Sequence, residues 1–241
     1  MHRHVRRVIP FLCLVFLLAC SHSPDNSRIA REYTDDFGTP FQIQFDNHVR
    51  RQPPAISVAP QSRIGHRPKA VFFPLRMTQQ MAGATSFSNA VSRQVWNIWV
   101  SFSMFHTLEF VETGVPYTPA MALSVGRQKG AELAVGGYIH HYIDGGTGGT
   151  SSVSLAMEVY DVATGVLLWS MAQGGMMESR QVHDFYLFSV KERNPGDPSG
   201  FIVRSLAWDM GLVLLKWINP LAARKIQGQT ETKTFFDGEA F

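Results

Sequence analysis

Two adjacent histidines in this 241-residue chain, His140 and His141, are of a type that could hold a metal ion. They lie in the stretch ELAVGGYIHHYID, which has the composition of a strand. Adjacent side chains in a strand point to opposite faces of the sheet, so the pair cannot easily chelate one ion. The sequence therefore predicts no metal site at these histidines.

The glycine-rich segment DGGTGGT, from Asp144 to Thr150, has the composition of a phosphate-binding loop. Such loops end in Lys-Ser or Lys-Thr and open a helix, whose amino terminus receives the phosphate. This segment lacks that ending, and the pattern that follows it is that of a strand. We therefore expect a hairpin connection here and no nucleotide site.

Glu158 and Asp161 come closest to an acid–base pair, but no His or Ser partner stands at a recognisable spacing from them. Asp161 precedes Thr164-Gly165 and suits a turn, in which its carboxylate accepts a backbone hydrogen bond. The chain offers no catalytic set. We predict a protein that is not an enzyme and that uses no cofactor.

The clearest chemistry is a covalent modification of Cys20. Residues 1–10 include three arginines and no acidic residue, and the apolar run Val8–Leu18 is well short of the roughly 20 residues that span a bilayer. A basic start, a short apolar core and a small-residue exit are typical of a secretory signal peptide. We assign residues 1–19 to it.

The exit Leu17-Leu18-Ala19-Cys20 resembles a bacterial lipobox. The resemblance implies that the Cys20 thiol is joined to diacylglycerol, that the chain is cut before it, and that the new amino terminus is acylated. An ordinary signal peptide with a coincidental cysteine is the alternative. Ser21 differs from the Asp that resembles an inner-membrane retention signal. We expect a lipoprotein that several acyl chains hold firmly to the periplasmic face of the outer membrane.

Removal of the signal peptide changes the charge balance. The whole chain has 22 Lys and Arg against 19 Asp and Glu. The signal peptide contains three of the arginines and no acid, so the mature chain has 19 residues of each sign and is formally neutral. The basic character belongs to the targeting segment, and we expect no nucleic-acid partner. Cys13 and Cys20 are the only cysteines, so the mature domain has no disulfide.

Residues 20–67 have the composition of an extended, Pro-rich tether. Within it, TPFQIQFD places Phe41, Ile43 and Phe45 on one face of a short predicted strand. Such a strand either folds back on its own domain or pairs with another molecule. We therefore note these three residues as candidates for contact with a partner.

Residues 68–220 are predicted to form a single globular domain, followed by a polar tail, residues 221–241. In chain order, the patterns indicate a strand at AVFFPL, a helix with an apolar stripe from Phe87 to Phe105 and with Ser86 or Ser88 as cap, a strand at TLEFVE, a helix from Thr118 to Gly130, three meandering strands, and a helix between Asp197 and Pro220. The order is βαβαβββα. The predicted fold class is α/β or α+β, with helices packed on one mixed sheet.

These elements carry a signature: a strand ending in Pro, a strand ending in Glu, then GRQKGAELAVGG and VYDVATGVLLW. It resembles a group of bacterial envelope proteins that includes CsgG, PelC, FlgO and the amino-terminal domain of TolB. The likeness covers about residues 68–218, and its most telling pieces include Gly136, Asp161 and Trp169. It implies this fold and a role in envelope export or surface-structure assembly.

Residues 176–195 form a longer connection than most, and Phe185, Tyr186 and Phe188 lie within it. These aromatic residues either cover one edge of the sheet and complete the core, or contact a partner or another copy of the chain.

Three hypotheses for function follow. The first is a non-enzymatic accessory or oligomeric component of an envelope export or surface-structure system, which self-associates on the membrane. The second is a monomeric periplasmic binding or scaffold module that recruits another, unknown envelope protein. The third is a hydrolase of envelope polymers, which the missing catalytic set disfavours. Size-exclusion chromatography with light scattering would separate the first two.

Overall fold

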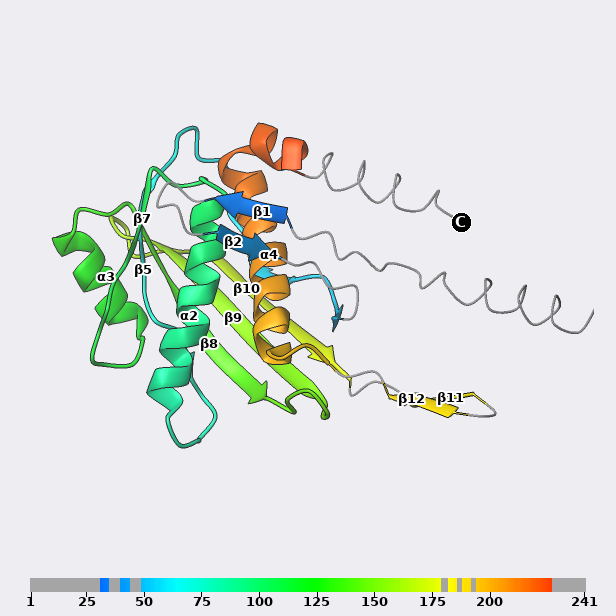
Figure 1. Ribbon diagram of the computed structural model, residues 1–241. Coiled ribbons are helices and arrows are strands. Elements are labelled where there is room, and N and C mark those ends of the chain that lie inside the picture. Colours follow the sequence, from blue (N-terminus) through cyan, green and yellow to red (C-terminus); the bar gives the residue numbers. More distant parts are fainter. Residues whose placement is uncertain are drawn as a thin grey trace, which may run out of the picture. The chain divides into compact units, whose positions relative to one another are not determined.

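A computed structural model describes residues 31–34, 40–43, 49–178, 182–185, 188–191 and 194–226 (Figure 1). The chain divides into two compact units, Met1–Phe45 and Asp46–Phe241. The described part of the first unit is an antiparallel hairpin of β1 (Arg31–Thr34) and β2 (Pro40–Ile43). The predicted strand in the tether is therefore present, and its partner is the strand just before it in the chain.

The second unit is built on an eight-stranded mixed sheet in the order β3-β10-β9-β8-β5-β7, with β4 also paired to β10 and β6 to β8. Strand β5 pairs in parallel with β7 and β8, whereas β8, β9 and β10 form an antiparallel meander. The predicted mixed sheet is confirmed. Its strands are β3 (Arg50–Arg51), β4 (Ala55–Val58), β5 (Lys69–Phe72), β6 (Arg76–Met77), β7 (Thr107–Phe110), β8 (Leu133–Ile143), β9 (Ser151–Asp161) and β10 (Leu167–Met177).

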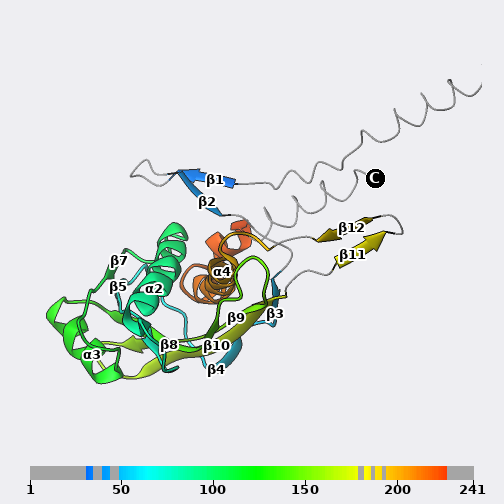
Figure 2. The same cartoon turned by 60° about the horizontal axis from the view of Figure 1, so that its bottom comes forward.

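Helices α2 (Ala84–Ser101) and α4 (Pro198–Ile218) lie side by side over one face of the sheet (Figure 2). The large core cluster fills the space beneath them, and it includes Ala70 and Phe72 of β5. The alternate residue Val71 belongs to a second, smaller cluster with Ala122 of α3 (Pro119–Gln128). Because side chains alternate along a strand, α3 covers the opposite face.

Two of the three helices with a predicted start begin as the sequence indicates. Thr118 accepts a hydrogen bond from the Met121 amide at 3.4 Å, and Asp197 accepts one from the Gly200 amide at 2.8 Å, each with Pro at the next position. After α3, Gly130 has a φ of +61°, the left-handed conformation that ends a helix. These local signals are strong because they satisfy backbone groups at the helix ends.

The start of α2 differs from the prediction. Gly83, with a φ of +73°, stands at the N-cap, and no side chain caps the helix there. Ser88 lies inside the helix, is buried, and donates its hydroxyl hydrogen to the Leu75 carbonyl. Ser92 supports the same loop by accepting the Leu75 amide hydrogen at 2.7 Å. These serines therefore hold the chain after β5 against the helix. In sequence alone, a serine with this role cannot be distinguished from a serine that caps the helix.

The folded domain also extends further toward the amino end than residue 68. Strands β3 and β4, which lie in the predicted tether, pair antiparallel with β10. Val49 is buried in the large core, and the Trp217 indole donates to the Ser62 carbonyl at 2.7 Å. The prolines of this segment predict a tether, whereas in the fold Pro53 and Pro54 separate two short edge strands.

A second hairpin follows β10. It consists of β11 (Val182–Phe185) and β12 (Phe188–Lys191), paired antiparallel with Phe185 opposite Phe188. Together with β1–β2 it is one of two two-stranded sheets among the described residues. Within those residues, no helix combines the length and hydropathy needed to cross a membrane.

Candidate docking edge

Strand β7 forms one end of the main sheet, and in the described residues its partner is β5 alone. Just after the strand, the Val111 amide donates toward β5, to the Phe72 carbonyl at 2.8 Å. Successive backbone amides of a strand point to opposite sides, so in the register of β7 on β5 the amides of Leu108 and Phe110 point away from β5. Both residues are partly exposed. We call this side of the strand the β7 edge.

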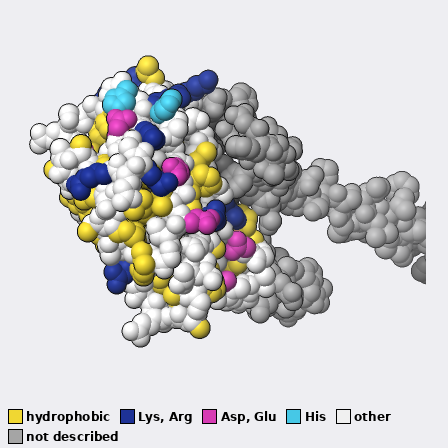
Figure 3. Space-filling model, turned by 90° about the vertical axis from the view of Figure 1, so that its left-hand side faces the viewer, with side chains coloured by type: hydrophobic (Ala, Val, Ile, Leu, Met, Phe, Trp, Pro, Cys, Tyr) yellow, Lys and Arg dark blue, Asp and Glu magenta, His cyan; other side chains and the backbone are white. Residues whose placement is uncertain are grey.

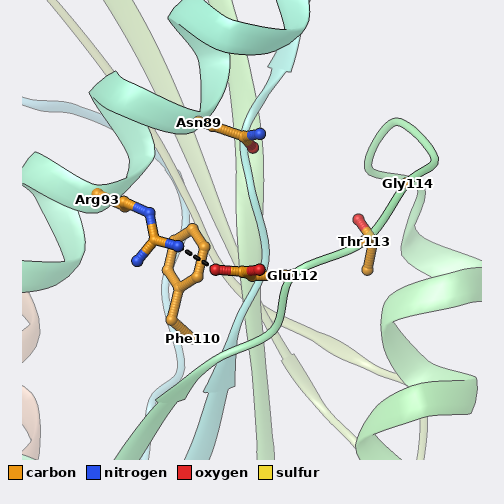
Figure 4. A pocket seen from close by; sticks show the side chains of 6 residues that line it. All are labelled: Asn89, Arg93, Phe110, Glu112, Thr113 and Gly114. Atoms are coloured by element: carbon orange, nitrogen blue, oxygen red, sulfur yellow. Dashed lines mark hydrogen bonds and ion pairs between the residues drawn. The ribbon is translucent and has the colours of Figure 1, made fainter.

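A shallow pocket of about 340 Å³ lies beside the end of β7 (Figure 4). Its lining comes from α2, from β7 and from the turn after β7, and consists of Asn89, Arg93, Phe110, Glu112, Thr113 and Gly114. The Arg93 guanidinium lies 4.7 Å from the centre of the Phe110 ring and forms an ion pair with Glu112. The pocket therefore presents an aromatic ring, a cation and an anion together.

Helix α2 also supports the strand itself. The Trp96 indole donates to the Leu108 carbonyl at 2.9 Å, and its ring packs against Phe110 with centroids 5.9 Å apart. On the other face, Lys129 pairs with Glu109 at 2.6 Å. Strand β7 is thus fixed from both faces.

The chemistry of this place favours binding. The side chains of Arg93 and Glu112 are 50% and 74% exposed, so their ion pair contributes only about 0–1 kcal/mol and can be exchanged for other contacts. Outward amides and carbonyls on a strand can pair with a further extended strand. We therefore treat the β7 edge as the candidate site.

The surface around it has no field of one sign. Figure 3 shows the side of the molecule that carries α3, where basic and acidic side chains lie next to one another among scattered apolar ones. Long-range charge therefore cannot select a partner, and recognition must depend on short-range contacts.

The opposite end of the sheet differs. The β3–β4 edge, residues 50–58, is interrupted by Pro53 and Pro54, and the register of β4 on β10 shifts between Ser170 and Met171. Proline and irregular pairing are devices that prevent a further strand from adding. This edge is also tied inward, because Arg51 donates to Asp209 of α4 at 2.7 Å.

The sequence-predicted chemical candidates have structural partners. His141 contacts the Ser152 hydroxyl at 2.9 Å, and His140 stacks on Tyr138. A register shift lies between Ile139 and His141, and both histidines are exposed. The described residues contain no group of three or more His, Cys, Asp or Glu side chains that could hold a metal ion.

The glycine-rich segment is the connection between β8 and β9, as predicted. Asp144 accepts from the Gly146 amide at 3.0 Å, and Asn194 donates to the carbonyls of Thr147 and Gly149. Asp161 likewise has the predicted role in its turn, where it accepts from the Thr164 amide at 2.9 Å. These two carboxylates therefore stabilise the backbone of the turns in which they lie.

Glu158 lies in a small polar cluster on the α3 face of the sheet. It accepts hydrogen bonds from the hydroxyls of Tyr117 at 3.1 Å and of Tyr160 at 3.2 Å. Burial, followed by the nearby Glu158 carboxylate, raises the pKa of Tyr160 to about 12, and the same causes raise the pKa of Tyr117. Both tyrosines therefore stay neutral and act as donors.

Gly136 completes this cluster. A Cβ atom at this position would meet the Tyr117 ring at 2.0 Å, so the ring packs directly on the backbone of β8. This contact gives a physical reason for one glycine of the signature that the sequence analysis noted.

The remaining sequence-predicted site residues lie on the two hairpins or outside the described residues. Phe41 and Ile43 lie on β2, and Phe185 and Phe188 on β11 and β12. Cys20, Phe45 and Tyr186 lie outside the described residues. Sequence reasoning missed Arg93, Phe110 and Glu112, because which strand ends a sheet depends on long-range pairing.

The comparisons add solved structures of similar fold. A PelC dodecamer from Paraburkholderia phytofirmans is 14% identical, with 68% of this chain and 96% of that chain covered and a TM-score of 0.43. A hypothetical protein, CT253, from Chlamydia trachomatis is 12% identical, with 64% and 99% covered and a TM-score of 0.41. The lipoprotein GNA1162 from Neisseria meningitidis is 12% identical, with 50% and 88% covered and a TM-score of 0.33. No protein-family model and no curated protein matches this chain.

Proposed function

We propose that this chain is a lipid-anchored protein at the periplasmic face of the outer membrane. It acts there without catalysis, as a self-associating accessory of an envelope export or surface-structure system. The observation that carries the proposal is the lipobox-like Leu17–Cys20 at the end of a short basic-apolar leader. Envelope partners and membrane lipid are its expected contacts.

Three observations support the non-catalytic part. The carboxylates and the histidine that chemistry would need are engaged with turns, tyrosines and a serine. The signature of residues 68–218 resembles envelope proteins of the CsgG, PelC, FlgO and TolB group. The β7 edge offers main-chain groups for pairing, which suits an assembly component.

The first experiment tests the anchor. Cys20→Ala should abolish incorporation of a labelled fatty acid and leave uncleaved precursor or soluble product. Cys13→Ala, which changes the other cysteine of the chain, is the matched control and should be acylated normally. Mass spectrometry of the mature amino terminus and membrane fractionation are the measurements. Unlipidated wild-type protein, or fractionation with the inner membrane, would contradict the proposal.

A monomeric periplasmic scaffold is the second candidate, since the edge of a two-stranded sheet such as β11–β12 can pair with a strand of a different protein. Light scattering on the mature protein in detergent separates the two. A single-chain mass at all concentrations favours the scaffold.

A further inference from the structure

Two segments far apart in the sequence meet at the side of the domain where the parallel strands begin. Strand β5 runs parallel to β7 and to β8, so the residues just before these three strands lie at the same side. The Trp217 indole of α4 donates to the Ser62 carbonyl at 2.7 Å, which places the end of α4 beside the loop before β5 (Figure 1). We call residues 61–67 and 216–226 together the basic pole.

Exposed cations gather at the basic pole. Those that form no ion pair with another residue in the described part of the chain are Arg63, Arg67, Lys216, Arg224 and Lys225. Two carboxylates lie at the same side of the domain, and both are engaged. Glu132, just before β8, contacts His66 at 2.6 Å, and Asp161, opposite Leu133, accepts from its turn. The pole therefore has an excess of positive charge, although the mature chain is formally neutral.

An exposed apolar side chain lies among these cations. Leu221, between Lys216 and Arg224 in the chain, is 75% exposed. Cations beside an exposed leucine suit the boundary of a lipid bilayer, because the leucine can enter the acyl region while the cations contact headgroup phosphates. A soluble polyanion would bind the cations but would leave Leu221 in water. The combination therefore favours a membrane surface as the partner.

We propose that the basic pole lies against an anionic lipid surface and so orients the domain on the membrane. The acyl chains at Cys20 hold the chain to the bilayer, whereas the pole decides which side of the domain faces it. This inference rests on the membrane location in the proposed function and adds the surface that contacts lipid.

The tether is long enough to allow this orientation. Segments 20–31 and 43–49 lie outside the β1–β2 hairpin, and their eleven and six Cα steps together reach at most about 60 Å when extended. Strand β3, where the chain enters the main sheet, pairs with the far end of β10, about 27 Å from the start of that strand. The anchor and the pole can therefore contact the same bilayer.

Vesicle binding tests the charge of the pole. The full mature chain with Cys20→Ala is used, so that no acyl chain contributes. It should sediment with vesicles that contain phosphatidylglycerol but not with pure phosphatidylcholine vesicles, and about 0.5 M salt should release it. Arg224→Glu with Lys225→Glu should lower the partition coefficient about tenfold or more. The matched control, Arg50→Glu with Arg76→Glu, changes the net charge equally at exposed residues of β3 and β6 and should bind like the parent. Circular dichroism checks that each variant folds.

A fluorescent probe tests the orientation. Cys20→Ala leaves the mature chain without a cysteine, so an environment-sensitive dye labels Leu221→Cys alone. Its emission should shift to the blue with phosphatidylglycerol vesicles. Val115, 58% exposed in the turn after β7 and hence at the opposite side of the domain, gives the control Val115→Cys, which should not shift.

Three results would overturn the proposal: binding that does not depend on phosphatidylglycerol, equal binding of the two charge variants, or a shift at Val115→Cys in place of Leu221→Cys. A parent that fails to bind these vesicles overturns it as well. None of these results bears on the acyl anchor, which the fatty-acid labelling of Cys20 tests separately.

Discussion

The two ends of the main sheet differ in how their edge strands are protected from pairing with a further strand. The β3–β4 edge is interrupted by prolines and held against α4, through the Arg51–Asp209 ion pair and the bond from Gln173 to Asp209 at 2.8 Å. The β7 edge is regular, and the ion pair beside it, between Arg93 and Glu112, faces solvent. The β3–β4 edge is therefore held by the rest of the domain, whereas the β7 edge can still bind a partner.

This contrast separates stability from recognition. Contacts that are partly buried and shared by several groups contribute to the free energy of unfolding, whereas exposed ion pairs contribute little. Substitutions near β3, β4 and β10 should therefore change stability. Substitutions near the β7 edge should change assembly and leave stability almost unchanged.

The largest expected effect is at Trp169 of β10. Its ring is 6% exposed and packs edge-on against Trp217 of α4, with centroids 5.9 Å apart. Trp169→Ala should lower the free energy of unfolding by about 3–5 kcal/mol, the usual range for removing a buried large aromatic. Urea denaturation followed by circular dichroism is the measurement. A variant as stable as wild type but inactive would show that Trp169 serves binding instead.

The sequence predicts the position of Trp169 in the fold but does not predict that Trp217 packs against it. The alternation of the meander and the turn at Asp161 placed Trp169 on the returning strand, against a helix, as the structure confirms. Caps at Thr118 and Asp197 were equally local signals. The identity of Trp217 as the packing partner depends on how α4 crosses the sheet, which no short sequence window contains.

The edges could not be predicted for the same reason. The sequence predicts a tether at Pro53 and Pro54, because proline lacks a backbone donor and is common in loops. Edge strands tolerate the same loss, so the prolines do not distinguish a tether from an edge. Likewise, TLEFVE was correctly predicted as a strand, but its place at the end of the sheet follows from pairing with β5 across an intervening helix. Phe110 and Arg93 are therefore identified as candidate site residues by the fold and not by the sequence.

A smaller effect is expected at Asp209, which holds the β3–β4 edge. Its carboxylate accepts from Arg51 and from the buried Gln173, and the side chains of the ion pair are 29% and 22% exposed. Asp209→Ala should lower the free energy of unfolding by about 1–3 kcal/mol, because Arg51 and Gln173 each lose an acceptor.

Asp209→Asn is the matched control for this position. It keeps an oxygen acceptor for Gln173 and removes only the charge, so it should lose less stability than Asp209→Ala. Chemical denaturation of both variants tests the order. Equal stability of Asp209→Ala and wild type would contradict the view that this edge is fastened by α4.

The smallest change in stability is expected at Arg93, on the β7 edge. Arg93→Ala removes the ion pair with Glu112 and the contact with Phe110. Exposed pairs and exposed cation–π contacts each contribute at most about 1 kcal/mol, so the loss of both should lower the free energy of unfolding by no more than about 2 kcal/mol. The assembled mass in light scattering should nevertheless decrease, because the pocket beside the β7 edge loses its cation. Glu112→Gln, which leaves the guanidinium over the ring, should assemble more fully than Arg93→Ala. If Arg93→Ala instead unfolded the domain and Asp209→Ala did not, the roles assigned to the two edges would be reversed.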